Sequence, residues 1–152
     1  MASNRHLGRI IALQTLYEYD FRIDCGDNDV TLAEILKRNL ARYDKTLDDK
    51  PFVTSLVDSV TAKATELDGI IQPIAPEWPI DQIARVDRTI LRMAVYELTE
   101  NGKEVPPKVV INEAVELAKA FGSDNSSKFV NGVLGTAYRT LIEGQADAEA
   151  KV

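Results

Sequence analysis

Apolar residues recur at steps of three and four along most of this chain, and no long stretch alternates between apolar and polar positions. Steps of three and four place side chains on one face of an α-helix. The clearest stripe lies within residues 53–71 and consists of Val53, Leu56, Val60, Ala64, Leu67 and Ile71. The pattern predicts an all-α fold, a compact bundle of about seven helices.

The N-terminal half of the pattern predicts three helices. The first is expected at residues 5–21, with Tyr17 among its core-facing side chains. The second begins at Thr31, because Thr31 and Glu34 have the spacing of a capping box, which satisfies free N–H groups at a helix start. The third is one long helix over residues 51–71.

Three prolines mark the clearest internal boundary. They fall within residues 72–79, and proline lacks the N–H group that a helix interior needs. Trp78 lies in the same segment, and we interpret it as a buried anchor between two helical halves. The sequence therefore predicts one helical domain at residues 1–143, with sub-bundles at about 5–72 and 80–143 and a flexible acidic tail at 144–152.

A polar hinge separates the last two predicted helices. Gly122 is typical of a helix C-terminus, and each of the polar residues 123–126 is able to cap the helix that follows. Lys128 falls in the first turn of that helix. A cation there opposes the helix dipole, but beside free N–H groups it forms an anion site. A solvated lysine is an equally good interpretation on physical grounds.

The charge balance argues against a general nucleic-acid binder. The chain has 152 residues, of which 45% are hydrophobic and 28% charged, and its net charge is −6. Its N-terminus is the exception, because Arg5, His6 and Arg9 precede the first acid, Glu18. A basic end on an acidic body predicts local, weak RNA contact that needs help from a partner.

The sequence gives no sign of export or membrane insertion. No apolar run approaches the roughly 18 residues that span a bilayer, and the N-terminus has no apolar leader. Cys25 is the only cysteine, which excludes an internal disulfide and a multi-cysteine metal site. We therefore expect a cytoplasmic location.

Residues suited to catalysis are scarce. His6 is the only histidine and has no serine or cysteine motif around it. Glycine-rich phosphate loops are missing from the sequence. Glu113 and Glu116 share a helix face, but without a histidine nearby a solvated face is a better interpretation than a metal site. The sequence predicts no enzyme, no cofactor and no metal.

Several blocks of the sequence resemble one known family. They are RIIALQTLY at residues 9–17, VDRTILRMAVYEL at 86–98, PPKVVINEA at 106–114 and INEAVELAKAFGSDNSSKFVNGVLG at 111–135. The INEA, ELAK and FVNGVL motifs are specific in combination, and the similarity spans residues 5–141. The chain resembles the NusB family of bacterial RNA-binding transcription antitermination factors.

The resemblance implies a two-bundle helical fold and a role in antitermination and ribosomal-RNA processing. It implies binding of boxA-type single-stranded leader RNA together with NusE, a small-subunit ribosomal protein, in the transcription elongation complex. A homodimer is an alternative if the partner surface associates with itself. Asp87 is the candidate partner contact, because its block belongs to the family's partner helix; a rim position without energetic weight is an equal alternative.

The candidate RNA-binding residues fall in two segments, which we expect to form one continuous surface. Basic side chains contact phosphates, and aromatic rings stack on unpaired bases. Phe129 lies at the edge of the core face, so a boundary core role is an equal alternative for it. The candidates are Arg5, His6 and Arg9 in the first segment, and Ser126, Lys128, Phe129 and Asn131 in the second.

The chain also departs from the family pattern. Its arginine-rich N-terminus is short, Ile10 stands where an acid is common, and Asn125 stands where aspartate is common. Fewer phosphate contacts lower RNA affinity and its salt dependence together. Two other hypotheses therefore stay open: a purely protein-binding helical adaptor for a basic ribosomal protein, and an accessory module of a separate RNA-modifying methyltransferase.

Overall fold

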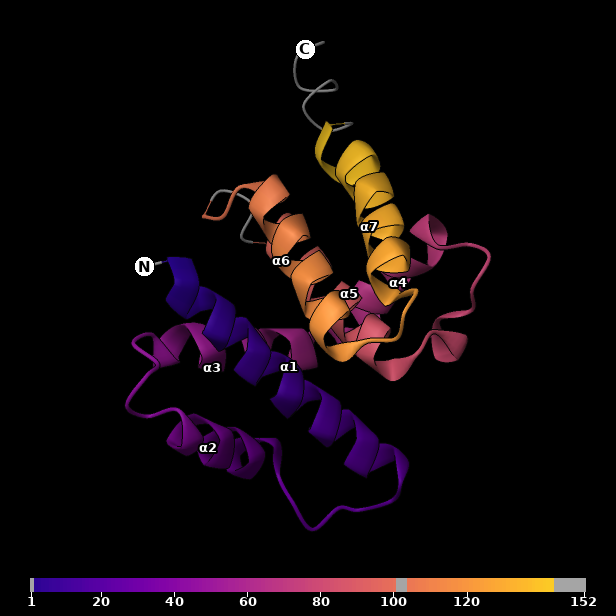
Figure 1. The fold of residues 1–152 in the computed structure, drawn as a ribbon. Coiled ribbons are helices and arrows are strands. Elements are labelled where there is room, and N and C mark those ends of the chain that lie inside the picture. The colour runs from indigo at the N-terminus through magenta and orange to yellow at the C-terminus, as the bar shows by residue number, and fades with distance from the viewer. Residues whose placement is uncertain (1, 101–103, 144–152) are drawn as a thin grey trace. The chain divides into compact units, whose positions relative to one another are not determined.

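The computed structural model describes residues 2–100 and 104–143, and the regular elements in these ranges are all helical (Figure 1). The predicted all-α fold of seven helices is confirmed. A short 3₁₀ turn, η1, precedes α5, and a π-type turn, η2, follows α7. The elements are α1 (Ala2–Asp24), α2 (Leu32–Arg42), α3 (Lys50–Ala62), α4 (Ala64–Ile74), η1 (Ile80–Gln82), α5 (Arg85–Thr99), α6 (Pro107–Phe121), α7 (Ser126–Ala137) and η2 (Tyr138–Glu143).

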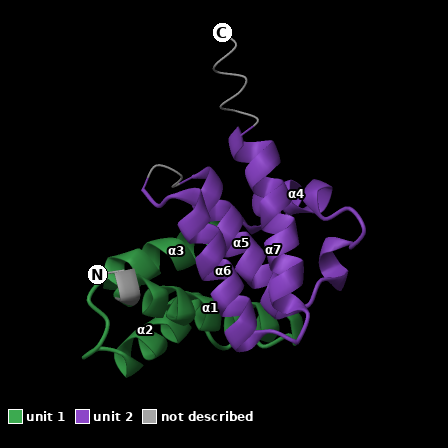
Figure 2. Cartoon of the chain, turned by 45° about the horizontal axis from the view of Figure 1, so that its top comes forward, with its two compact units in different colours: residues 1–62 green, residues 63–152 purple. Residues whose placement is uncertain are grey.

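The chain divides into two compact units, residues 1–62 and residues 63–152 (Figure 2). The first unit ends at residue 62, whereas the sequence predicted sub-bundles at about 5–72 and 80–143. The apolar stripe continues across Lys63, so periodicity alone predicts one helix where α3 ends and α4 begins. The predicted tail at 144–152 lies outside the described residues.

In the first unit α1 packs against both α2 and α3. A buried polar bridge joins α1 to α2: the Asn39 amide donates to the Thr15 hydroxyl over 3.0 Å, and that hydroxyl donates to the Ile11 carbonyl over 2.8 Å. Both side chains therefore have partners in the core. Tyr17, expected in the core, is instead 36% exposed and stacks on the exposed Phe21 ring.

The predicted start of α2 is confirmed. Thr31 is the N-cap residue, and its hydroxyl accepts the Glu34 N–H over 3.2 Å. This bond satisfies one of the donors that a helix start leaves free.

In the second unit α5 is the central helix, with α4, α6 and α7 packed against it. Its apolar residues are buried on most sides, including Ile90, Leu91 and Val95. Arg92 fixes α5 to α4, because its guanidinium donates two hydrogen bonds of 2.7 Å to the two oxygens of Asp68. Such a paired contact sets the orientation of the two helices as well as their distance.

The proline-rich segment differs from its prediction in two ways. Helix α4 includes Pro73 in its last turn, and the Trp78 side chain is 51% exposed rather than buried. The segment is held by Gln72, whose amide donates to the Trp78 carbonyl and accepts the Ile80 N–H, each over 2.8 Å. These hydrogen bonds between the Gln72 side chain and the backbone fix the turn, so burial of the indole is not needed to hold it.

Candidate nucleic-acid interface

The hinge between α6 and α7 is closed by Ser126. Its hydroxyl accepts the Ser123 N–H over 2.8 Å, and its residue is only 2% exposed. A Cβ on Gly122 would lie 2.4 Å from that hydroxyl oxygen, so glycine is required by this close approach. The φ of Gly122 is −92°, so glycine is not needed there for a left-handed backbone conformation at the end of α6. Ser126, predicted to contact RNA, instead holds the hinge closed.

Helix α7 begins without a side-chain cap. Asn125 is its N-cap residue but makes no capping hydrogen bond, and the first turn carries no acidic residue. The Ser126 N–H donates to the Ser123 carbonyl over 3.1 Å, whereas the N–H groups of residues 127 and 128 precede the first helical hydrogen bond, from the Phe129 N–H to the Asn125 carbonyl. Lys128 and Asn131 are exposed on this end of the helix. The arrangement suits an anion such as a phosphate.

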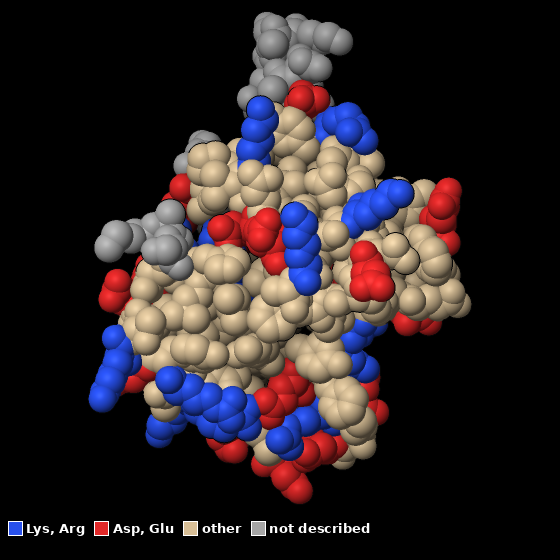
Figure 3. Space-filling model, viewed as in Figure 1, with Lys and Arg blue, Asp and Glu red and all other residues tan. Residues whose placement is uncertain are grey.

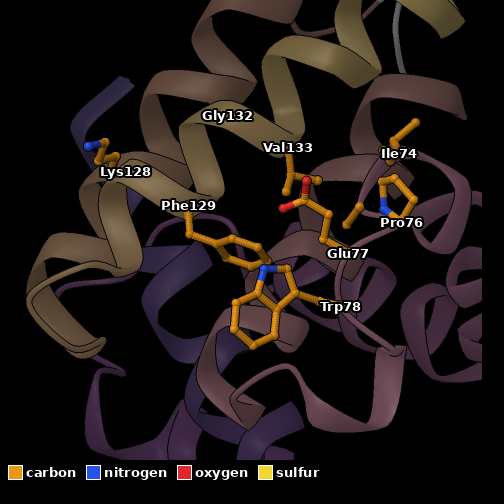
Figure 4. A pocket seen from close by; sticks show the side chains of 9 residues that line it. Ile74, Pro76, Glu77, Trp78, Lys128, Phe129, Gly132 and Val133 are labelled. Carbon is orange, nitrogen blue, oxygen red and sulfur yellow. The ribbon is translucent and has the colours of Figure 1, made fainter.

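Two hollows adjoin the start of α7, and both are lined by Phe129 and Trp78. The first, which we call the Gly132 hollow, has a volume of about 310 Å³. Figure 4 shows the Phe129 ring directed toward the Trp78 indole, with the Glu77 carboxylate extending toward α7. Its walls are Pro76, Glu77 and Trp78 after α4, and Lys128, Phe129 and Gly132 of α7.

The second, the Asp87 hollow, has a volume of about 340 Å³ and also borders Gln82 and Asn125. Asp87 is 7% exposed, and its buried Oδ1 atom has no hydrogen-bond partner. A buried carboxylate oxygen without a partner is costly, so it calls for a donor from outside. Asp87, the candidate partner contact, therefore lies inside a hollow, and its contact with a partner stays a prediction.

The basic N-terminal segment is less available than the sequence suggested. The guanidinium groups of Arg5 and Arg9 lie 4.6 Å and 5.2 Å from the centre of the Phe52 ring, in cation–π geometry. Arg9 is only 3% exposed, so it is not placed to contact a phosphate. Arg5 keeps 35% of its side chain exposed and lies 3.7 Å from Asp49, while His6 is partly buried. Contacts with the Phe52 ring therefore hold the two guanidinium groups against the protein.

On the face shown in Figure 3, lysine and arginine side chains are interspersed with aspartate and glutamate. Among the residues with described positions, no three potential metal-ligating side chains gather. Nor does any helix within the described ranges have both the length and the apolar character needed to cross a membrane.

Sequence reasoning missed two members of the candidate interface, Trp78 and Glu77. A signal was present, since Pro76 and Pro79 flank them and such segments run over the protein surface. Of the seven predicted RNA contacts, the structure brings three exposed or partly exposed residues together at one helix start: Lys128, Phe129 and Asn131. It turns Ser126 and Arg9 inward.

The seven-helix, all-α arrangement defines the class of fold: it is NusB-like. The chain belongs to the NusB family, which matches residues 6–139. The family consists of transcription antitermination proteins and is non-enzymatic, as the sequence predicted.

Similarity to individual relatives extends over nearly the whole chain. The transcription antitermination protein NusB of Chloroflexus aggregans is 44% identical over 151 residues, covering 98% of this chain and 97% of the relative. A solved structure of T. maritima NusB superposes with a TM-score of 0.75 at 33% identity, covering 86% of this chain and 87% of that one. A NusB chain solved with NusE and double-stranded RNA gives a TM-score of 0.77 at 28% identity, with 92% and 99% covered.

Proposed function

We propose that this chain is a cytoplasmic antitermination factor that binds boxA-type single-stranded leader RNA of ribosomal-RNA operons together with NusE. In this role it joins the transcription elongation complex and supports ribosomal-RNA transcription and processing. The observation that carries the proposal is the start of α7, an uncapped helix end with an exposed lysine beside an accessible aromatic ring.

Each part of that helix start has a role toward RNA. Lys128 and the N–H groups of residues 127 and 128 hold a phosphate, Phe129 stacks on an unpaired base, and Asn131 donates to or accepts from a base edge. A stacked base contributes about 1–3 kcal/mol. Arg5 and His6 are proposed as secondary contacts, because neither is fully buried.

The Asp87 hollow is the proposed contact for the partner protein. A carboxylate oxygen that is buried and unpartnered in the free chain suits a cationic side chain of a basic protein. The net charge of −6 adds a long-range attraction for such a partner. The similarity to a NusB chain solved with NusE and double-stranded RNA supports NusE as the partner.

A purely protein-binding adaptor is the second candidate function. It is favoured by the acidic body and by the inward position of Arg9. An adaptor binds NusE as tightly with or without RNA, whereas the RNA-binding factor does not. If the partner surface associates with itself, the free chain sediments as a homodimer that NusE dissociates.

The deciding experiment is a titration of boxA-type RNA with the chain alone and with the chain plus NusE, at two salt concentrations. We expect weak binding alone, tighter binding with NusE, and competition by single-stranded but not by duplex RNA. Phe129→Ala is expected to lose about 1–3 kcal/mol of RNA binding while still binding NusE. RNA binding that is undetectable in both titrations would leave the adaptor as the function.

A further inference from the structure

Building on the proposed RNA-binding function, we infer that the Gly132 hollow holds one unpaired RNA base, stacked on Trp78 and hydrogen-bonded by Glu77. The occupant is one nucleotide of the strand whose phosphate lies at Lys128. The hollow and the proposed RNA site share Lys128 and Phe129, so a strand that crosses the helix start continues into the hollow.

Trp78 has the features of a prepared stacking surface. Its side chain is 51% exposed, although tryptophan is among the residues most often well buried. Its backbone is nevertheless fixed by Gln72, through the hydrogen bonds of 2.8 Å to the Trp78 carbonyl and the Ile80 N–H. An exposed ring on a fixed turn stacks on a base with little loss of backbone entropy.

The hollow suits a base better than a phosphate. Its volume of about 310 Å³ is at the small end of the range for ligand pockets, and aromatic rings stand on its walls. The Glu77 carboxylate repels a phosphate, whereas Lys128 at the rim attracts one. In Figure 4 the Lys128 side chain points away from the hollow, whereas the Glu77 carboxylate extends toward α7, so the charges favour the backbone outside, at Lys128, and the base inside.

Glu77 gives the hollow a base preference. An ionised carboxylate only accepts hydrogen bonds, and it pairs with the exocyclic amino groups of cytosine and adenine. Uracil has a carbonyl oxygen where cytosine has its amino group. We therefore expect the hollow to select a base with an amino group over uracil.

Trp78 is the only tryptophan in the chain, so its fluorescence reports on the hollow directly. With the chain bound to NusE, single-stranded boxA-type RNA is expected to quench this fluorescence. Trp78→Ala is expected to weaken RNA binding about tenfold, and Trp78→Phe to restore most of it. Glu77→Gln is expected to reduce the preference for cytosine over uracil in single-base replacements of the RNA.

Gly132 supplies a variant that fills the hollow without disturbing the fold. A Cβ on Gly132 meets no atom within 4 Å, and leucine favours a helix more than glycine does. Gly132→Leu is therefore expected to fold normally, bind NusE normally and weaken RNA binding about as much as Trp78→Ala. Gly69→Leu is the control, because Gly69 has the same open surroundings in α4.

The outcomes separate this inference from the proposed function. If RNA binds and Phe129→Ala weakens it, but Trp78→Ala and Gly132→Leu bind as the parent does, the hollow is not a base site and the proposed function stands. A second result also overturns the inference: NusE alone quenches the Trp78 fluorescence, Gly132→Leu does not reduce this quenching, and added RNA does not change it. If RNA does not bind with or without NusE, both fail together.

Discussion

Single residues at the α6–α7 hinge decide whether the start of α7 keeps its shape. Gly122 and Ser126 approach so closely that a side chain on the glycine would overlap the serine hydroxyl. The hydroxyl in turn fixes the Ser123 N–H. A residue chosen for RNA binding from its sequence position therefore proves to hold the hinge that positions its neighbours.

The first prediction follows from that contact. Gly122→Ala places a Cβ 2.4 Å from the Ser126 Oγ atom and 2.8 Å from the Ala118 carbonyl oxygen, so the hinge must shift. We expect a loss of about 1–3 kcal/mol in the free energy of unfolding, measured in urea. Gly132→Ala on α7 is the matched control, with an expected gain of about 0.5–1 kcal/mol. Equal stability of the two variants would refute the close approach.

Asp87 carries the second prediction. Replacing it by asparagine removes the negative charge beside a buried Oδ1 atom that has no hydrogen-bond partner in the free chain, so Asp87→Asn is expected to unfold no more easily than the parent. The same change is expected to weaken NusE binding by about 2–5 kcal/mol, because the cationic side chain loses its counter-ion. Calorimetric titration measures the affinity and urea unfolding the stability. Normal NusE affinity would assign Asp87 no part in the partner contact.

Helices of the first unit are joined by polar as well as apolar contacts. Glu18 on α1 accepts hydrogen bonds from Arg38 on α2 and from Arg22 on its own helix. The Arg38 hydrogen bond, opposed by partial burial and assisted by Arg22, holds the pKa of the Glu18 carboxyl below its ordinary value. The ionised form therefore stabilises the folded unit.

The third prediction concerns pH. Because the folded pKa of Glu18 is lowered, its stabilisation is complete above the ordinary glutamate pKa and disappears as the pH falls through the folded pKa. We expect Glu18→Gln to be less stable than the parent at neutral pH and equally stable in strong acid, in unfolding curves recorded across this range. Glu116→Gln is the control, because that carboxylate is 60% exposed and its Lys119 partner lies at 3.6 Å. A stability difference between the parent and Glu18→Gln that does not change with pH would contradict the role of Glu18.

The helices and their ends were predictable from the sequence where a single local pattern determines them. The periodicity gave the helices, and the spacing of Thr31 and Glu34 gave the start of α2. The break at Lys63 was not predictable, because the apolar stripe does not register it. The burial of Trp78 was predicted wrongly, because a hydrophobic pattern contains no sign of the Gln72 hydrogen bonds that hold the turn.

The candidate site was predictable in part for a related reason. The pattern at the predicted helix start indicated a lysine and an edge aromatic; Lys128 is exposed and Phe129 partly exposed at the start of α7, and their contact with RNA stays a prediction. The burial of Arg9 depends on the Phe52 ring, which lies far along the sequence, and that of Ser126 on its close approach to Gly122. Such tertiary contacts decide which polar residues face solvent, and no local pattern contains them.

At the scale of the whole molecule, the protein has a net charge of −6, and its proposed RNA ligand is negatively charged as well. Long-range electrostatics therefore oppose RNA and favour a basic partner. RNA binding must rest on a few local contacts, and the partner's charge must offset the acidic body. This explains why the proposed affinity depends on NusE and on the start of α7.

The measurement that tests this account most directly is the salt dependence of RNA binding for Lys128→Ala, with NusE present. Removing one phosphate contact is expected to weaken binding and to reduce the slope of log affinity against log salt by about 0.7. Lys119→Ala removes another exposed lysine, from α6, and is expected to leave the slope unchanged. If both variants keep the parent's affinity and slope, the start of α7 does not bind RNA.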